Sequence, residues 1–456
     1  MASTSIRKTF SSNGNTKKWT FSAWIKRTGL GSVQRLLSCD EAGNNNHDDF
    51  YQFQNDDTIV LGHYDSGYYA NLTPTRKFRD CNSWYHFVIT WDTAQSTASD
   101  RFKFYVNGVQ ETSFSTATYP SQNKDSFINT TEPIEIGKRS DNDTQYLDAL
   151  LTHVHFCDGY AYAASDFGET DATTGEWKAK TSPSVSYGTN GFFIFKDGNS
   201  LTDQSSNTNN WSAVSGTLTD LKDNPDNVFC TMNPLDNYWQ GSTFSNGNNT
   251  VVSGSSSTTF NTSTLMMTSG KWYAEVKPTA GSATSQIGVT GRLAVNATSS
   301  LAITTSAVGY LDSGSVWGSN TNQGGTWSTY SNNDIIGIAI NLDNTQGGLN
   351  KLYFSKNGVW QNSADPSNHS STTGVLGITA PSNLTGTDNG AYAFAMNETW
   401  NDNTRTWQWN FGNGYFGTTA VATNSGNGYA GAEGASKFNY QPPTGFSALS
   451  TKGLNE

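Results

Sequence analysis

Charged residues are scarce in this chain of 456 residues, in which Asp, Glu, Lys and Arg together make up 14%. The formal net charge is −11, and the sequence contains no basic stripe, which argues against a nucleic-acid-binding protein. No apolar run approaches the roughly 18 residues of a membrane span. The start of the chain, MASTSIRKTF, has no apolar signal core. We therefore expect no membrane insertion and no secretory signal.

Cysteine is rarer still, and its four residues lie far apart in the sequence, at Cys39, Cys81, Cys157 and Cys230. None of them belongs to a CxxC pair. The even number permits two disulfides, but the spacing differs from that of a small disulfide-stapled domain. We expect reduced and mostly buried thiols.

Aromatic residues and glycine are abundant instead, with 14 Trp, 20 Tyr, 24 Phe and 44 Gly. This aromatic content excludes a disordered chain and is sufficient for a sizeable core. Thr, Tyr, Phe and Trp between turns rich in Gly and Asn favour β-sheets. The predicted fold class is therefore all-β.

The clearest strand pattern lies in the stretch 334–363. Every second residue from 336 to 342 is Ile or Leu, which is the period of a strand with one face in a core. After a polar turn, a second strand over 351–356 leads into Asn357-Gly358. Asn-Gly between alternating runs is the strongest short-range signal of a β-hairpin.

The same pattern occurs earlier in the chain, over residues 84–109. Alternating Tyr, Phe, Ile and Trp residues occupy 85–91, a second strand covers 101–106, and Asn107-Gly108 follows. The repeat predicts two antiparallel β-sandwich domains in tandem. Each domain is built around a long strand, a turn, a strand and an Asn-Gly hairpin.

A change of composition marks the border between the domains. Residues 199–237 are rich in Asp, Asn, Ser and Pro, which is typical of loops. We place the boundary in this segment, so that the domains are 1–232 and 233–456, and expect part of the segment to pack on a sandwich. Residues 167–178 are the one candidate helical region, and the Pro-containing stretch 438–450 fits an edge strand.

Patterns of catalytic residues are missing. Glycan-cleaving enzymes need two facing carboxylates, most simply as alternating acids along one strand, and no predicted strand carries them. Glu132 and Glu135 point to opposite faces, and Glu275 stands alone. The sequence also lacks a GxSxG motif, a Cys/His dyad spacing and a phosphate loop. We expect a protein that is not an enzyme, with a polysaccharide depolymerase as the less favoured alternative.

Two groups of side chains have the composition of a metal site. His153 and His155 are two residues apart on a predicted strand, so both leave one face, and imidazole binds zinc or copper. The sequence offers no obvious third ligand, and the alternative is a pair of structural or surface histidines. Acids in polar loops are candidates for a structural calcium, with hydrated turn acids as the alternative, and no other cofactor is expected. These acids are Asp40-Glu41, Asp56-Asp57, and Asp141 with Asp143.

Aromatic residues also cluster in segments rich in Gly, Ser and Asn. An exposed flat ring beside amide and hydroxyl side chains suits a sugar, because the ring stacks on the sugar and the polar groups bond its hydroxyls. The alternative is that these rings fold back over the ends of the sandwich core. The candidate glycan-binding residues are Tyr64, Tyr68 and Tyr69, and Trp317, Trp327 and Tyr330.

Several motifs resemble two families of β-sandwich. WTFSAWIKR, WYHFVITWD and RFKFYVNGVQ resemble concanavalin A-like, laminin-G-like modules over residues 10–200. GKWYAEVK, NNDIIGIAINLD, KLYFSKNGVW, WNFG and PPTGFSAL resemble SPRY-type sandwiches over most of 238–450. The resemblances imply jelly-roll, concanavalin A-like sandwiches, and laminin-G-like modules often hold calcium on a rim.

The whole chain, including HVHFCDGYAYAASDFGETDATTGEW and DNVFCTMNPLDN, also looks like virion proteins of tailed marine bacteriophages. Such proteins are usually described as tail-fibre or other structural proteins. The resemblance implies a virion protein that is assembled in the host cytoplasm. The expected partners are other virion proteins, further copies of the chain and host cell-surface polysaccharide. A purely structural decoration or cement role is the alternative.

Overall fold

The computed structural model describes residues 3–40, 47–196, 198–238, 241–254, 259–281, 284–294, 301, 306–343, 350–386, 388–398, 404–421 and 428–455. The chain forms two compact units, Met1–Asp220 and Leu221–Glu456, whereas composition placed the boundary after residue 232. Strands dominate both units, so the all-β class is confirmed. Within the described part of the chain, no helix has the length and hydropathy to span a membrane.

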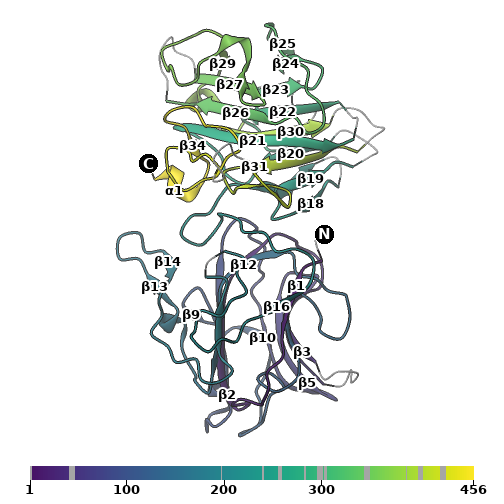
Figure 1. The fold of residues 1–456 in the computed structure, drawn as a ribbon, viewed down its shortest axis with the longest axis vertical. Coiled ribbons are helices and arrows are strands. Elements are labelled where there is room, and N and C mark those ends of the chain that lie inside the picture. Colours follow the sequence, from purple (N-terminus) through teal and green to yellow (C-terminus); the bar gives the residue numbers. More distant parts are fainter. Residues whose placement is uncertain are drawn as a thin grey trace. The chain divides into compact units, whose positions relative to one another are not determined.

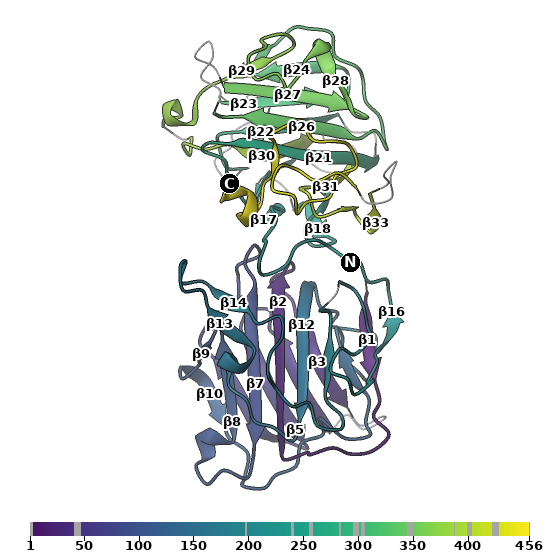
Figure 2. The ribbon, with the colours of Figure 1, turned by 60° about the vertical axis from the view of Figure 1, so that its left-hand side comes forward.

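The first unit contains an eight-stranded and a six-stranded antiparallel sheet (Figure 1). The eight-stranded sheet has the order β10 (Phe114–Thr118), β6 (Tyr68–Pro74), β5 (Ile59–Asp65), β4 (His47–Phe53), β3 (Gln34–Asp40), β11 (Ile134–Ile136), β1 (Ser5–Lys8), β16 (Ser212–Ser215). The six-stranded sheet has the order β15 (Phe192–Ile194), β12 (Ala149–Asp158), β2 (Lys18–Arg27), β7 (Tyr85–Asp92), β8 (Phe102–Val106), β9 (Val109–Gln110). Figure 2 shows β7, β2 and β12 side by side in this layer.

The second unit contains a seven-stranded and a nine-stranded sheet. The first has the order β17 (Met232–Tyr238), β20 (Thr259–Ser263), β30 (Ala393–Glu398), β22 (Ser285–Thr290), β23 (Ala307–Leu311), β24 (Ser315–Gly318), β25 (Thr321–Asn322). The second has the order β18 (Thr243–Ser245), β19 (Thr250–Val252), β31 (Thr406–Asn410), β21 (Lys271–Ala280), β26 (Ile336–Asn341), β27 (Asn350–Lys356), β28 (Val359–Trp360), with β29 (Leu376–Ile378) on β27 and β34 (Ser447–Ala448) on β21.

Small elements complete both units. They are the hairpins β13 (Gly168–Thr170) with β14 (Trp177–Ala179) and β32 (Tyr415–Phe416) with β33 (Thr419–Ala420), the 3₁₀ turns Ala98–Asp100, Ala164–Asp166, Gln361–Ser363 and Pro381–Asn383, and the helix α1 (Thr451–Leu454).

The repeat that the sequence predicts is present in both units as one frame of five strands. The orders β12-β2-β7-β8-β9 and β31-β21-β26-β27-β28 correspond strand by strand. The Asn side chains of the two hairpin turns also make the same bond. Asn107 Oδ1 accepts the His86 N–H at 2.7 Å, and Asn357 Oδ1 accepts the Ile335 N–H at 2.8 Å. Both Asn residues have positive φ, of 47° and 49°, as such turns require.

Each unit has its own aromatic core between its two sheets. In the first unit the rings of Trp19 and Trp91 stack with centroids 5.9 Å apart. In the second, Trp409 and Phe411 stack at 5.2 Å. All four cysteines are buried and none of them is in a disulfide, in agreement with the expected buried thiols.

Three local expectations need correction. Residues 167–178 are not helical but lead into the hairpin of β13 and β14, which Trp177 anchors by donating to His86 Nδ1 at 3.0 Å. The stretch 438–450 is mostly irregular rather than one strand, and its two residues in β34 pair in parallel with β21, the one strand partner that the described residues give it. Strand β26 is buried on both faces rather than one, because Phe438 lies against the face that turns away from the core.

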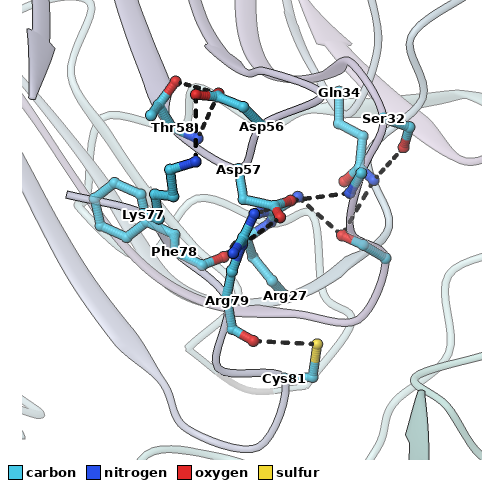
Figure 3. A network of polar contacts seen from close by, with 12 residues as sticks. Arg27, Ser32, Gln34, Asp56, Asp57, Thr58, Lys77, Phe78, Arg79 and Cys81 are labelled. Atoms are coloured by element: carbon cyan, nitrogen blue, oxygen red, sulfur yellow. Dashed lines mark hydrogen bonds and ion pairs between the residues drawn. The ribbon is translucent and has the colours of Figure 1, made fainter. Parts of the chain in front are cut away.

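A buried ion pair fixes three loops at one end of the first unit (Figure 3). The Arg27 side chain is 0% exposed, and its guanidinium donates to the Asp57 carboxylate at 3.2 Å, the Phe78 carbonyl at 2.7 Å and the Gly29 carbonyl at 2.9 Å. Arg79 reaches the same carboxylate at 3.0 Å from a side chain that is 57% exposed. Burial lowers the pKa of Arg27, and Asp57 opposes that shift.

We expect Arg27→Met to destabilise the first unit by about 3–5 kcal/mol, because it leaves the Asp57 carboxylate buried without its main cation. Urea unfolding followed by tryptophan fluorescence measures this loss. Arg79→Ala is the matched control, and its loss should be about 0–1 kcal/mol because the Arg79 side chain is largely exposed. Equal losses in the two variants would contradict the assignment.

Candidate functional site

A row of four side chains crosses neighbouring strands on the outer face of the eight-stranded sheet, which is the face opposite its core. The strand register pairs Asp40 with Asp48, Asp48 with Tyr64, and Tyr64 with Tyr68. Side chains that are directly opposite in an antiparallel pair leave the same face. The row therefore brings a candidate calcium ligand and two candidate glycan-binding rings together.

The two tyrosines of the row form an aromatic corner on the hairpin of β5 and β6. Their rings meet edge to face with centroids 5.4 Å apart, and Tyr68 is 49% exposed. Tyr68 also approaches the ring of Phe50 at 6.3 Å. Phe50 can lie over β5 because residue 62 is a glycine. A Cβ at this position would stand 2.6 Å from the Phe50 ring.

Arg35 neutralises the second acid of the row. Its guanidinium binds Asp48 through two nitrogens at 2.8 and 3.1 Å and lies over the Phe50 ring at 4.0 Å. Such a bidentate pair is among the stronger charged contacts in proteins. Burial nevertheless raises the pKa of Asp48, and Arg35 opposes that rise.

Asp40 is the exceptional member of the row. Its side chain is 4% exposed, and neither carboxylate oxygen has a hydrogen-bond partner among the described residues. Burial, and then the charges of Asp48 and Asp141, raise its pKa from 3.8 to about 7. The proton of this carboxyl is therefore exchanged near neutral pH. Glu41, its neighbour in the sequence, lies outside the described residues.

The other acids predicted for calcium are occupied by cations of the chain itself. Asp141 binds Arg139 at 2.6 Å, and Asp143, which is 82% exposed, binds Lys138 at 2.6 Å. The Lys138 ammonium lowers the pKa of Asp143. Within the described ranges, no three His, Cys, Asp or Glu side chains gather closely enough to hold a metal ion.

The histidine pair takes part in packing. His155 is 1% exposed, stacks on Phe193 at 3.9 Å between ring centroids, and shares a hydrogen bond of 2.9 Å with the Tyr187 hydroxyl. His153 lies at a bulge of β12 with a positive φ of 47°, and the two imidazole centroids are 6.5 Å apart. Burial lowers the pKa of His155, which therefore remains neutral.

The remaining predicted rings divide between core and surface. Tyr69 turns inward, where its hydroxyl donates to Asp49 at 2.7 Å. Trp327 and Tyr330 belong to the core of the second unit, with exposed fractions of 9% and 3%. For these three residues the structure corresponds to the alternative, in which the rings cover the core. Trp317 is half-buried in β24.

Sequence reasoning missed Arg35, Asp48 and Phe50 as members of the site. Their pattern along β3 and β4 is that of an ordinary strand, and no motif connects Arg35 with Tyr68. Only the register across four strands brings them together.

Solved structures resemble the chain at low similarity. The SPRY domain of human HERC1 is 17% identical, with a TM-score of 0.28 over 39% of this chain and 96% of that chain. A SAP-like pentraxin from Limulus polyphemus is 14% identical, with a TM-score of 0.28 over 39% and 85%. Domain 4 of AbnA, a GH43 extracellular arabinanase from Geobacillus stearothermophilus in complex with arabinotriose, is 17% identical, with a TM-score of 0.25 over 32% and 64%. These likenesses assign neither a ligand nor a site to this chain.

No curated protein matches the chain. A family model described as the concanavalin A-like lectin/glucanases superfamily matches residues 3–166, most of the first unit. This match confirms the concanavalin A-like fold that the strand motifs of the first domain predict.

Proposed function

We propose that the chain is a non-enzymatic virion protein that binds saccharides of a host surface through the outer face of its eight-stranded sheet. The observation that carries the binding role is the exposed Tyr68 ring, held edge to face against Tyr64 on a concanavalin A-like sandwich. An aromatic ring offers an apolar face with a polar hydroxyl at its edge. Such a ring stacks on a sugar while neighbouring polar groups bond the hydroxyls.

The virion part of the proposal rests on the resemblance of the whole sequence to phage structural proteins. Other virion proteins and further copies of the chain are its proposed partners, and the virion is its proposed location. A purely structural decoration or cement role is the second possibility in this class. It is supported by two uncharged edge strands with mainly exposed residues, Phe114–Thr118 and Ser212–Ser215, whose free backbone groups suit pairing with a neighbour.

The non-enzymatic part rests on access to the acids of the row. Asp40 and Asp48 are 4% and 6% exposed, and Arg35 already occupies the Asp48 carboxylate. A glycosidase requires two carboxyl groups that reach the substrate from a separation of roughly 5 to 9.5 Å. Binding at Tyr68 needs no such access.

We expect Tyr68→Ala to weaken saccharide binding about tenfold, because it removes the stacking surface. A glycan array, followed by calorimetry with the best ligand, measures the change. Tyr68→Phe is the matched control and should retain most of the affinity, because it keeps the ring. Undiminished binding by Tyr68→Ala would place the binding site elsewhere, and wild-type protein that binds no host saccharide would refute the binding role.

One observation favours a second candidate function, polysaccharide hydrolysis. Asp40 and Asp48 face each other across β3 and β4, an arrangement that the sequence does not show along any single strand. We expect incubation with host capsule to release no new reducing ends, because both acids are covered. Release that disappears in both Asp40→Asn and Asp48→Asn would establish hydrolysis instead.

The buried Asp40 carboxyl predicts a specific pH dependence of stability. Its pKa is raised from 3.8 to about 7, so the folded chain keeps a proton that the unfolded chain releases. The stability from this group is complete below its unfolded pKa and is lost as the pH rises through about 7. We therefore expect the midpoint of thermal unfolding of Asp40→Asn to rise relative to wild type between about pH 4 and pH 7.

The control for this prediction is Asp143→Asn, which changes an exposed acid of the neighbouring loop. Its unfolding midpoint should show no gain over wild type across the same pH range. Parallel curves for wild type and Asp40→Asn would contradict the assigned titration.

A further inference from the structure

An open hollow in the first unit lies outside the row on the eight-stranded sheet. Three chain segments line it, residues 12–15, 158–160 and 188–189, and its volume is about 530 Å³. This lies within the range of about 300–1,000 Å³ for small-molecule sites. No residue of the hollow was a candidate in the sequence, because its segments consist mainly of Gly, Asn, Ser and Thr.

The Asp158 carboxylate forms the floor and holds the three segments together. Its Oδ1 accepts the Asn15 N–H and the Asn129 side-chain amide, both at 2.7 Å. Its Oδ2 accepts the N–H groups of Thr189 at 3.2 Å and Asn190 at 3.0 Å. Because four N–H donors engage this buried carboxylate, it is a structural anchor with little capacity left for a cation.

Close backbone contacts keep the walls in place. A Cβ at Gly188, whose φ is +67°, would stand 2.1 Å from the Asp158 carbonyl oxygen, and a Cβ at Gly14 would stand 2.4 Å from the Asn129 side chain. Asn190 also donates to the Ser12 carbonyl at 2.9 Å. The hollow is therefore formed before any ligand arrives, which lowers the entropic cost of binding.

One wall is an aromatic platform. Tyr160 is 42% exposed and stacks on Tyr162, with centroids 5.7 Å apart and an angle of 12° between the rings. Tyr162 is itself fixed, because its hydroxyl accepts the Ser186 N–H at 2.8 Å and its ring meets the edge of Phe167. The exposed ring of Tyr160 thus has a defined position at the opening.

The exposed polar groups of the hollow are all uncharged. Ser12 and Thr189 carry hydroxyls, and Asn13 and Asn15 carry side-chain amides whose Oδ1 atoms already accept the N–H groups of Thr131 and Lys17. Hydroxyls donate and accept, and an amide does both through separate atoms, so the set matches the alternating donors and acceptors of sugar hydroxyls. Among the described residues that line the hollow there is no Lys, Arg or His to attract a carboxylate or sulfate.

We infer that this hollow is a second saccharide site, which takes an uncharged sugar residue stacked on Tyr160 without the help of a metal ion. The inference rests on the proposed function, in which the protein binds saccharides, and adds to it both a location and a ligand class. The row at Tyr68 contains Asp40 and Asp48 and lies beside Arg35, whereas the hollow offers uncharged groups next to an Asp158 carboxylate that four N–H donors already engage. Two subsites of different character would let one unit hold two parts of a glycan chain.

The test uses the full chain with neutral oligosaccharides (maltose, lactose, cellobiose and xylobiose) and with oligogalacturonate as the acidic probe. Ligand-observed NMR and calorimetry give the affinities. We expect a neutral sugar to bind, with an affinity that falls about tenfold in Tyr160→Ala and is retained in Tyr160→Phe. The affinity should be the same with EDTA, and between about 20 and 500 mM NaCl, because no charge pairs with the ligand.

Tyr68→Ala separates this site from the row on the sheet. Neutral-sugar binding that Tyr160→Ala weakens more than Tyr68→Ala does supports the hollow. Binding that only Tyr68→Ala weakens overturns the saccharide site in the hollow but leaves the proposed function in place. Preferential and salt-dependent binding of oligogalacturonate has the same two consequences. A wild-type chain that binds none of these probes and no glycan on the array overturns both. Far-UV circular dichroism and the unfolding midpoint confirm that each variant is folded.

Discussion

Buried carboxylates that collect the backbone N–H groups of loops are the constraint on which both units depend. Asp49, Asp158, Asp203, Glu275 and Glu433 are each less than 9% exposed, and each accepts bonds from two or more backbone N–H groups. A sandwich with long irregular connections has many N–H groups outside its ladders, and a buried N–H without an acceptor is costly. One acid can hold several loop segments at once, because an ionised carboxylate has about four acceptor positions.

This constraint separates the acids that anchor loops from Asp40. Asp158 and Asp40 are similarly buried, at 6% and 4% exposure, but Asp158 accepts four N–H bonds and Asp40 accepts none from the described residues. Burial without donors raises the pKa of Asp40 to about 7. A buried polar group that lacks partners requires an explanation other than folding. In the first unit Asp40 is one such group, and it lies in the row that ends at the exposed Tyr68.

The sequence predicts the elements of the fold far better than its sites. Asn107 and Asn357 lie in the hairpin turns that the Asn-Gly pairs predict. That signal is local, because Asn and Gly themselves tolerate the positive φ that such turns require. The row of Asp40, Asp48 and Tyr68 has no local signal, because it runs across strands and depends on registers set by distant packing. The hairpin found in place of the expected helix at 167–178 also depends on packing against a distant part of the chain. Its Trp177 is fixed by His86, a partner 91 residues away in the sequence.

The shared five-strand frame also explains why the proposed binding is assigned to the eight-stranded sheet and the hollow of the first unit. In both units the frame is covered on the side away from the core by a later part of the same chain. In the first unit, Trp177 covers His86. In the second unit, Phe438 packs beside Glu275, and the Glu275 carboxylate accepts the N–H groups of the next two residues, Asn439 and Tyr440. A sheet face sealed by its own chain is not available to a ligand. Among the described residues of the first unit, the most exposed rings are Tyr68 on the outer face of the eight-stranded sheet and Tyr160 at the hollow, and the proposed saccharide binding is therefore assigned to these two places.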